Sequence, residues 1–288
     1  MNRAQRAEIR GLGLNNARTA KAAVAELEAS GERLSSLVEE LTGESLTYAT
    51  PAIFERRRSL LRAASKMLAT KGFHGFTVKD VCVEAGVSPY TLYKAFESKE
   101  RLVAVALATR FRAFHERTST LFPAATLDGV VCRLIYSDRA LIEDSATTKA
   151  VIAIHYSPSV DESVRRVCRE KGRLIYSPWA NALFRQGQLR RGVNPAELTE
   201  DLTSVLFAVC WDWARGAFDD EAFLQRKLKV MLAFMAGVTR GAAQAEITAL
   251  LTDLLGPQKR LQELRQLSVS NWLAERDAGK GSLSRIGF

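Results

Sequence analysis

The strongest hydrophobic pattern in the chain lies between residues 56 and 107. Leu60, Ala64 and Leu68 recur at helical spacing, so they place one apolar face on a first helix. Gly72 follows, and glycine readily takes the left-handed conformation that ends a helix. The pattern therefore predicts a first helix that stops close to this glycine.

Two shorter helices are predicted directly after the first. Thr77 can cap a second helix whose apolar residues form a single buried face. Gly86 allows a sharp turn, and Ser88 and Pro89 provide the cap and the first-turn residue of a third helix. Two short helices joined by such a turn indicate a helix-turn-helix.

The third helix of this unit has an inward and an outward face. Leu92 and Phe96 share the inward face, which leaves Tyr90, Thr91 and Lys94 pointing outward near the N-terminal half. A recognition helix places its N-terminal residues against base edges in the major groove. The pattern therefore favours DNA binding, although any small three-helix unit shows a similar periodicity.

The same stretch also carries a set of family motifs in a fixed order. They are Ala63-Ala64, Leu68, Gly72-Phe73, Phe76-Thr77-Val78, Val81, Ala85-Gly86-Val87-Ser88, Thr91-Leu92-Tyr93, Phe96, Ser98-Lys99-Glu100 and Leu102. In this order they resemble the N-terminal domain of the TetR family of transcriptional regulators. Two positions depart from the family pattern: Cys82 stands where alanine is usual, and Ala95 stands where an aromatic or basic residue is frequent.

The resemblance implies roles for individual residues. It implies that Thr77, Tyr93 and Lys99 hold DNA phosphates. The residues expected at or near the bases are Ser88, Pro89, Tyr90, Thr91 and Lys94, and Val78 completes the expected DNA-binding set. Cys82 is a small hydrophobe and should fit the core, whereas Ala95 removes a possible backbone contact and changes the expected footprint.

The chain beyond Leu102 is predicted to be helical almost throughout. A fourth helix should run from a Ser98 cap to about Leu121, and in the TetR family this helix carries ligand-driven movement to the DNA-binding domain. Further helices are expected at about 126–137, 138–155, 160–187, 195–216, 220–240, 243–255 and 258–277. Ser177-Pro178 should bend or divide the 160–187 segment. The fold class is therefore all-α.

Residues 1–50 precede the family motifs and are predicted to form a helical arm and linker. The apolar residues between Arg18 and Leu41 follow a heptad spacing over about two heptads. One hypothesis is an arm that extends the dimer or contacts DNA; the alternative is a segment packed on its own subunit. The predicted domains are this arm (1–50), a helix-turn-helix domain (51–100), an effector-binding and dimerisation domain (101–255) and a C-terminal helical extension (256–288).

The net charge supports the DNA-binding interpretation once it is divided by segment. The chain of 288 residues carries a formal charge of +9, and residues 51–110 contain 11 Lys/Arg against 5 Asp/Glu. A basic surface on a helix-turn-helix neutralises DNA phosphates. No apolar run reaches membrane-spanning length and the N-terminus lacks a secretory signal, so a cytoplasmic protein is expected. The four cysteines show no C-x-x-C pairing, which favours buried thiols over a zinc site or disulfides, with a redox-sensing thiol as the alternative.

The resemblance also implies an apolar effector pocket between central helices. The aromatic and histidine residues expected to line it are Phe111, Phe114, Tyr136, His155, Tyr156, Tyr176, Trp179, Phe184 and Trp211. An acyl chain, steroid or aromatic compound would suit such a pocket. The alternative is that these side chains simply fill the core. Three histidines give no metal constellation, and no cofactor is expected.

Dimerisation is expected through the helices at 195–216 and 220–240. Each has a broad apolar face, and two such helices from each subunit can form a four-helix bundle. The interface residues expected on this basis are Leu202, Val205, Leu206, Val209, Leu228, Met231 and Met235. The alternative is that both helices close the core of a monomer.

These features together favour a ligand-responsive repressor that binds a pseudo-palindromic operator as a homodimer and is released by a small, mostly apolar effector. An alternative is a DNA-bound adaptor or structural protein of the same fold, controlled by a protein partner. A helical enzyme is the weakest hypothesis, because the sequence contains no G-x-S-x-G motif and no phosphate-binding glycine loop.

Overall fold

The computed structural model describes residues 51–256 and 259–277, and all its regular elements are helices. The predicted all-α fold is therefore confirmed. One isolated bridge between Leu189 and Thr239 accompanies them within the described residues. The predicted arm at residues 1–50 lies outside the described residues.

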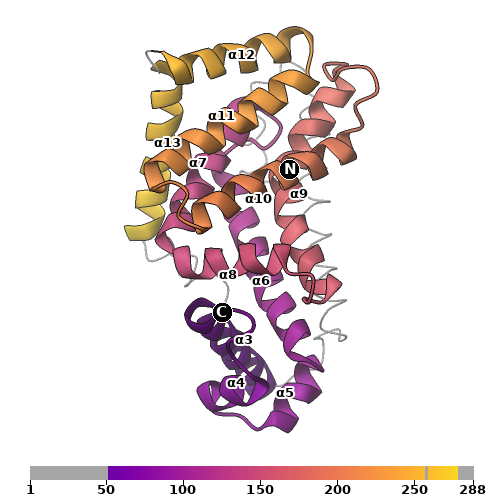
Figure 1. Ribbon diagram of the computed structural model, residues 1–288, viewed down its shortest axis with the longest axis vertical. Coiled ribbons are helices and arrows are strands. Elements are labelled where there is room, and N and C mark those ends of the chain that lie inside the picture. The colour runs from indigo at the N-terminus through magenta and orange to yellow at the C-terminus, as the bar shows by residue number, and fades with distance from the viewer. Residues whose placement is uncertain (1–50, 257–258, 278–288) are drawn as a thin grey trace.

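Three helices form a small unit at one end of the molecule, here called the headpiece (Figure 1). They are α3 (Pro51–Lys71), α4 (Val78–Ala85) and α5 (Pro89–Phe96). Leu60, Cys82, Leu92 and Phe96 are buried at its centre, so Cys82 fits the core as expected. Apolar residues at helical spacing therefore form one core shared by the three helices.

Local hydrogen bonds fix the ends of the headpiece helices as the sequence predicts. Thr77 forms a capping box with Asp80, whose carboxylate accepts from the Thr77 amide at 2.7 Å. Ser88 caps α5 by accepting from the Thr91 amide at 3.2 Å. Gly86, between α4 and α5, has φ +65°, a conformation that side-chain-bearing residues rarely adopt.

The remaining helices form the body of the molecule. They are α6 (Lys99–Leu121), α7 (Leu127–Glu143), α8 (Ser145–Tyr156), α9 (Glu162–Arg185), α10 (Pro195–Ala214), α11 (Asp220–Val238), α12 (Gly241–Leu255) and α13 (Lys259–Asp277). Figure 1 shows α6 rising from the headpiece into the body, with α12 at the opposite end of the molecule. As predicted, α6 begins at a Ser98 cap and ends at Leu121.

The boundary between α7 and α8 differs from the prediction. A break at residues 137–138 was expected, but α7 continues to Glu143 and the break falls at Asp144. Asp144 has φ −111° and ψ 54°, and its carboxylate accepts a hydrogen bond from Arg110 of α6 at 2.6 Å. A contact between distant segments therefore accompanies this break, and no local sequence signal marks it.

Pro178 does not divide α9, which is helical from Glu162 to Arg185. Proline lacks the N–H group that would bond to the carbonyl four residues earlier, here the carbonyl of Leu174. The buried Arg133 side chain of α7 donates to that carbonyl at 3.2 Å. Arg133 therefore satisfies the acceptor that Pro178 leaves open. Of the two predicted outcomes, a bend or a division of the helix, the division is wrong.

A glycine permits close packing between α9 and α10. A Cβ atom added to Gly172 would lie 1.9 Å from the Thr203 hydroxyl oxygen of α10, so any side chain would force the helices apart. On the other side of the body α13 packs against α7, where the Ser268 hydroxyl donates to the Cys132 carbonyl at 2.9 Å. The C-terminal helix is thus anchored to the body.

Candidate DNA-binding surface and effector cavity

The outward face of α5 presents the residues expected to read DNA. The side chains of Tyr90 and Tyr93 are 74% and 51% exposed, and Lys94 is also exposed. Thr91 is half-buried, and its hydroxyl lies 3.0 Å from the Ser88 hydroxyl. The predicted helix phase is therefore correct, since these side chains face away from the core.

Thr77 and Val78, at the start of α4, are partly committed to the headpiece itself. The Thr77 hydroxyl donates to the Asp80 carboxylate at 2.7 Å, and Val78 packs against the core. Hydrogen bonds from Thr77 hold the pKa of Asp80 below its usual range. The exposed Lys79, which the sequence analysis did not select, lies in the same turn and has no ion pair among the described residues. The sequence signal that could have selected Lys79 was its position as a basic residue in the first turn of the second helix.

Lys99 occupies a different environment from the one expected of a phosphate-binding lysine. Its Nζ donates to the carbonyls of Phe73 and Phe76 at 2.7 and 2.8 Å. The same nitrogen lies 4.6 and 4.5 Å from the centres of those two rings. Partial burial lowers its pKa. Lys99 therefore joins the first turn of α6 to the loop between α3 and α4, and at most one of its three protons is left for a phosphate.

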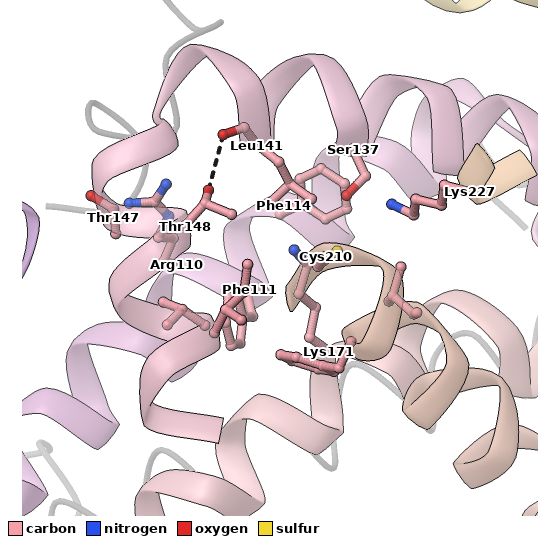
Figure 2. Close-up of a pocket in the computed structure, with 14 residues that line it drawn as sticks. Arg110, Phe111, Phe114, Ser137, Leu141, Thr147, Thr148, Lys171, Cys210 and Lys227 are labelled. Atoms are coloured by element: carbon pink, nitrogen blue, oxygen red, sulfur yellow. Dashed lines mark hydrogen bonds between the residues drawn. The ribbon is translucent and has the colours of Figure 1, made fainter. Parts of the chain in front are cut away.

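A mostly apolar cavity lies in the body between α6, α7, α8, α9, α10 and α11 (Figure 2). Its walls consist of Arg110, Phe111, Phe114, Ser137, Leu141, Thr147, Thr148, Val151, Ile152, Lys171, Leu206, Phe207, Cys210 and Lys227. Its volume is only about 40 Å³, enough for a few water molecules. A ligand of ordinary size would need the cavity to widen.

The aromatic residues predicted for the pocket fall into three groups. Phe111 and Phe114 line the cavity. Tyr136, Tyr176 and Trp179 are buried in the core but do not line it. The remaining four lie in the last turns of three helices: His155 and Tyr156 in α8, Phe184 in α9 and Trp211 in α10.

Three of those four form an aromatic group beside the cavity. His155 stacks on the cavity residue Phe207, with ring centres 3.8 Å apart, and Tyr156 lies 5.0 Å from Trp211. Burial and two nearby arginines lower the pKa of His155, so a neutral imidazole is favoured at neutral pH. Phe184 is 58% exposed and lies away from both groups. The aromatic composition therefore identified the core of the body more often than the cavity wall.

Three cationic side chains line the cavity, and sequence reasoning missed all of them. Arg110 pairs with Asp144 at 2.6 Å, and Lys227 forms a fully buried ion pair with Asp138 of α7. Lys171 has no ion pair or hydrogen bond within the described part of the chain. Figure 2 shows the Lys171 nitrogen near the centre of the group, beside Cys210. Only the fold reveals that these lysines face inward, because charged residues in a helix usually face water.

A second, more open hollow of about 600 Å³ lies at the far end of the body from the headpiece. Its walls come from the segment joining α6 to α7 and from α7, α9, α12 and α13, and include Asp128, Gln186 and Glu246. It is more polar than the first cavity and does not contact the N-terminal half of α6. The first cavity is therefore the better candidate for an effector that acts on the headpiece.

The residues predicted for the dimer interface mostly face the core of their own chain. Leu202, Leu206, Val209, Leu228, Met231 and Met235 are buried within the single chain, and Val205 alone is partly exposed. The broad apolar faces of α10 and α11 therefore pack inside the protomer, because α10 lies against α9 and α11 lies against α10, α12 and α7. The residues left exposed on α10 and α11 include Ser204, Ala208, Ala233 and Gly237, with Val230 and Phe234 partly exposed.

All four cysteines are free and buried, as the packing interpretation predicts. Burial raises the pKa of Cys132 and of Cys168 to about 12. Such thiols carry almost no thiolate at neutral pH and are poor nucleophiles. Within residues 51–256 and 259–277, no helix is long and apolar enough to cross a membrane.

Comparison with known proteins places this geometry in a family. Residues 60–106 match the model of the bacterial regulatory proteins of the tetR family. Over 154 residues the chain is 29% identical to the HTH-type transcriptional repressor KstR2 of Rhodococcus jostii (strain RHA1), covering 51% of this chain and 70% of KstR2. It is 40% identical over 58 residues to the HTH-type transcriptional regulator UidR of Escherichia coli (strain K12), covering 20% of this chain and 30% of UidR.

Solved structures of bacterial repressors align with most of their own length. SmeT, the repressor of the Stenotrophomonas maltophilia multidrug efflux pump SmeDEF, aligns with a TM-score of 0.49 and 18% identity over 68% of this chain and 94% of SmeT. NalD of Pseudomonas aeruginosa, the secondary repressor of the MexAB-OprM pump, aligns with a TM-score of 0.48 and 17% identity over 65% of this chain and 98% of NalD. The headpiece motifs, the helix-turn-helix geometry and the family match agree: residues 60–106 form a DNA-binding domain of the tetR family of bacterial regulatory proteins.

Proposed function

We propose that this regulator is a repressor that binds a pseudo-palindromic operator as a homodimer and is released by a small effector bound in the body. One observation carries the proposal: α6 contacts both sites. Its first turn is tied to the headpiece through Lys99, and about three to four turns further along Arg110, Phe111 and Phe114 line the cavity. A change in cavity width would therefore shift the helix on which the headpiece rests.

The regulation follows from linkage between the two sites. Two recognition helices must lie about 34–36 Å apart to enter successive major grooves. An effector that favours another spacing lowers the affinity of the protein for DNA. Bound DNA lowers the affinity for the effector by the same factor, which typically corresponds to about 1–3 kcal/mol of coupling free energy. Operator affinity measured with and without a compound known to bind the body tests this. An unchanged affinity would contradict the proposal.

We expect the base preference of the protein to depend on the exposed residues of α5. Tyr90→Ala or Thr91→Ala should cost about 1–3 kcal/mol of operator affinity and relax the preference at one base pair. Lys79→Ala should weaken binding to all sequences alike and reduce the salt dependence. Binding titrations against an operator and single-base variants of it measure both effects. Unchanged preference in both α5 variants would show that other residues read the bases.

We further propose that two copies associate through the outward faces of α10 and α11. These faces carry small or apolar exposed residues at mid-helix positions, such as Ala208 on α10 and Ala233 on α11. Small residues allow helices of two subunits to approach closely, and apolar neighbours such as Phe234 lose water on contact. The interface of this proposal is therefore the surface opposite the buried faces that the sequence pattern selected.

The dimer proposal is tested by placing a charge on this surface. Ala208→Arg or Ala233→Arg should produce a folded monomer, because each side chain is exposed in the protomer and would be desolvated in the dimer. Light scattering gives the mass and circular dichroism confirms the fold. Ala249→Arg, at an exposed position of α12, is the matched control and should remain dimeric. A dimeric mass for both test variants would rule out this surface.

A further inference from the structure

The charges around the cavity do not balance within the described residues. Arg110 is neutralised by Asp144 at 2.6 Å, and Lys227 is neutralised by the buried Asp138. Among residues 51–256 and 259–277, Lys171 has no acidic partner and no hydrogen bond. Its nitrogen lies 5.6 and 6.0 Å from the ring centres of Phe111 and Phe114. The cavity wall therefore carries one uncompensated positive charge.

Lys171 is partly exposed, so its ammonium group keeps part of its contact with water and loses the rest to the cavity wall. Loss of water around Lys171 lowers its pKa to about 8, and the charges of Lys227 and Arg110 act in the same direction. Asp138 and Cys210 also face it and oppose the shift. Two weak contacts with aromatic rings do not replace the lost hydration of a lysine. An anion in the cavity would provide the missing partner.

We propose that the effector is an amphipathic monocarboxylate whose carboxylate binds the Lys171 ammonium and whose aliphatic or aromatic part lies among Val151, Ile152, Leu206 and Phe207. The inference rests on the proposed function, since it names the chemical class of ligand for the same cavity. A neutral apolar ligand would fill the cavity but leave Lys171 without a partner. A cationic ligand would add a second uncompensated charge. A monocarboxylate provides one negative charge to pair with Lys171 and an apolar part to contact the apolar wall.

The first experiment measures binding directly, without DNA. Saturated carboxylates from butanoate to dodecanoate, together with 2-naphthoate, are compared with the alcohol and the amine of the same carbon skeleton by calorimetry at pH 7. We expect at least one carboxylate to bind at least about tenfold more tightly than its alcohol, as for a charge-assisted hydrogen bond. Lys171→Met should remove this preference and Lys171→Arg should keep it. Failure of every carboxylate to bind, or equal binding of the alcohols, would overturn the proposal.

The pH dependence gives a second readout that needs only the wild-type protein. Below about pH 7 Lys171 is charged and the affinity for the carboxylate should be constant. As the pH rises through the pKa of about 8, the free protein loses this charge and the affinity should fall by up to tenfold per unit. Binding near pH 8.5 should then take up a proton, seen as a heat that depends on the buffer. A flat profile up to pH 9.5 would overturn the assignment of Lys171 even if Lys171→Met did not fold.

The same compounds then separate this inference from the regulatory proposal. A carboxylate that binds through Lys171 but leaves operator affinity unchanged would contradict release by an effector and leave the ligand class intact. Release of the operator by alcohols and carboxylates alike, with no effect of Lys171→Met, would support effector release and contradict the ligand class.

Discussion

Replacing Lys99 by methionine should reduce binding to all DNA sequences because it destabilises the headpiece. The substitution removes two charge-assisted hydrogen bonds, at 2.7 and 2.8 Å, and leaves the carbonyls of Phe73 and Phe76 without this donor. It also removes the contacts of the ammonium with the two rings. We expect a loss of about 2–4 kcal/mol in the stability of the headpiece. The family resemblance alone had implied that Lys99 holds a DNA phosphate.

Hydrogen exchange of the headpiece amides measures this effect, because it reports local as well as global opening. Lys99→Met should accelerate exchange in α4 and α5 more than in α9. Lys94→Met is the matched control, since Lys94 is exposed on α5 and forms no hydrogen bond or ion pair with the part of the chain that the structure describes. It should weaken DNA binding without changing exchange. Normal protection in Lys99→Met, together with a reduced salt slope, would restore the simple phosphate role.

The contrast between these two lysines shows what local sequence could and could not predict. Lys94 was placed outward from the spacing of Leu92 and Phe96 alone, and the structure confirms it. The environment of Lys99 depends on the carbonyls of Phe73 and Phe76, more than twenty residues away. Helix phase and caps are local properties, so the headpiece was well predicted. Contacts across helices are not local, and the contacts of Lys99 with the loop between α3 and α4 were missed.

The body was harder to predict for the same physical reason. An apolar helix face must be buried, but the pattern does not say whether its own chain or a second copy buries it. Leu206 and Met231 were assigned to a dimer interface, and both pack within the protomer. Pro178 was expected to disturb α9, but its effect depends on Arg133, a residue of another helix. The cavity was sought among aromatic residues, whereas its distinctive feature is three inward-facing cations.

The buried ion pair between Lys227 and Asp138 should be the most sensitive point in the body. Both side chains are almost completely buried, at 1% and 0% exposure, so removing either partner leaves an uncompensated charge in the core. We expect Lys227→Met to lower the free energy of unfolding by about 3–5 kcal/mol. The double substitution Lys227→Met with Asp138→Leu should recover most of this loss, because it removes both charges together. Urea denaturation of the single and double variants measures the coupling.

The control for this prediction is an ion pair on the surface. Arg173 and Glu200 lie 2.6 Å apart, but their side chains are 47% and 57% exposed. Arg173→Met should therefore cost no more than about 1 kcal/mol. If Lys227→Met and Arg173→Met lose a comparable free energy of unfolding, the Asp138 charge left in Lys227→Met must be hydrated or neutralised in some other way.

The pH dependence of the Lys227→Met variant provides the decisive measurement. Burial raises the pKa of the Asp138 carboxyl, and Lys227 is the main charge that opposes this shift. Without Lys227, the pKa of Asp138 in the folded protein should rise further above its value in the unfolded chain. At a pH between the two values, the folded protein then binds a proton at Asp138 that the unfolded chain lacks. The stabilisation from protonation is complete below the unfolded pKa and disappears as the pH rises through the folded pKa. The loss in free energy of unfolding of Lys227→Met relative to wild type should therefore become smaller as the pH is lowered from 8 to 5. The double variant lacks the Asp138 carboxyl, so its stability relative to wild type should show no such trend. An equal deficit at both pH values would indicate that the loss comes from packing around residue 227 and not from the unpaired carboxylate.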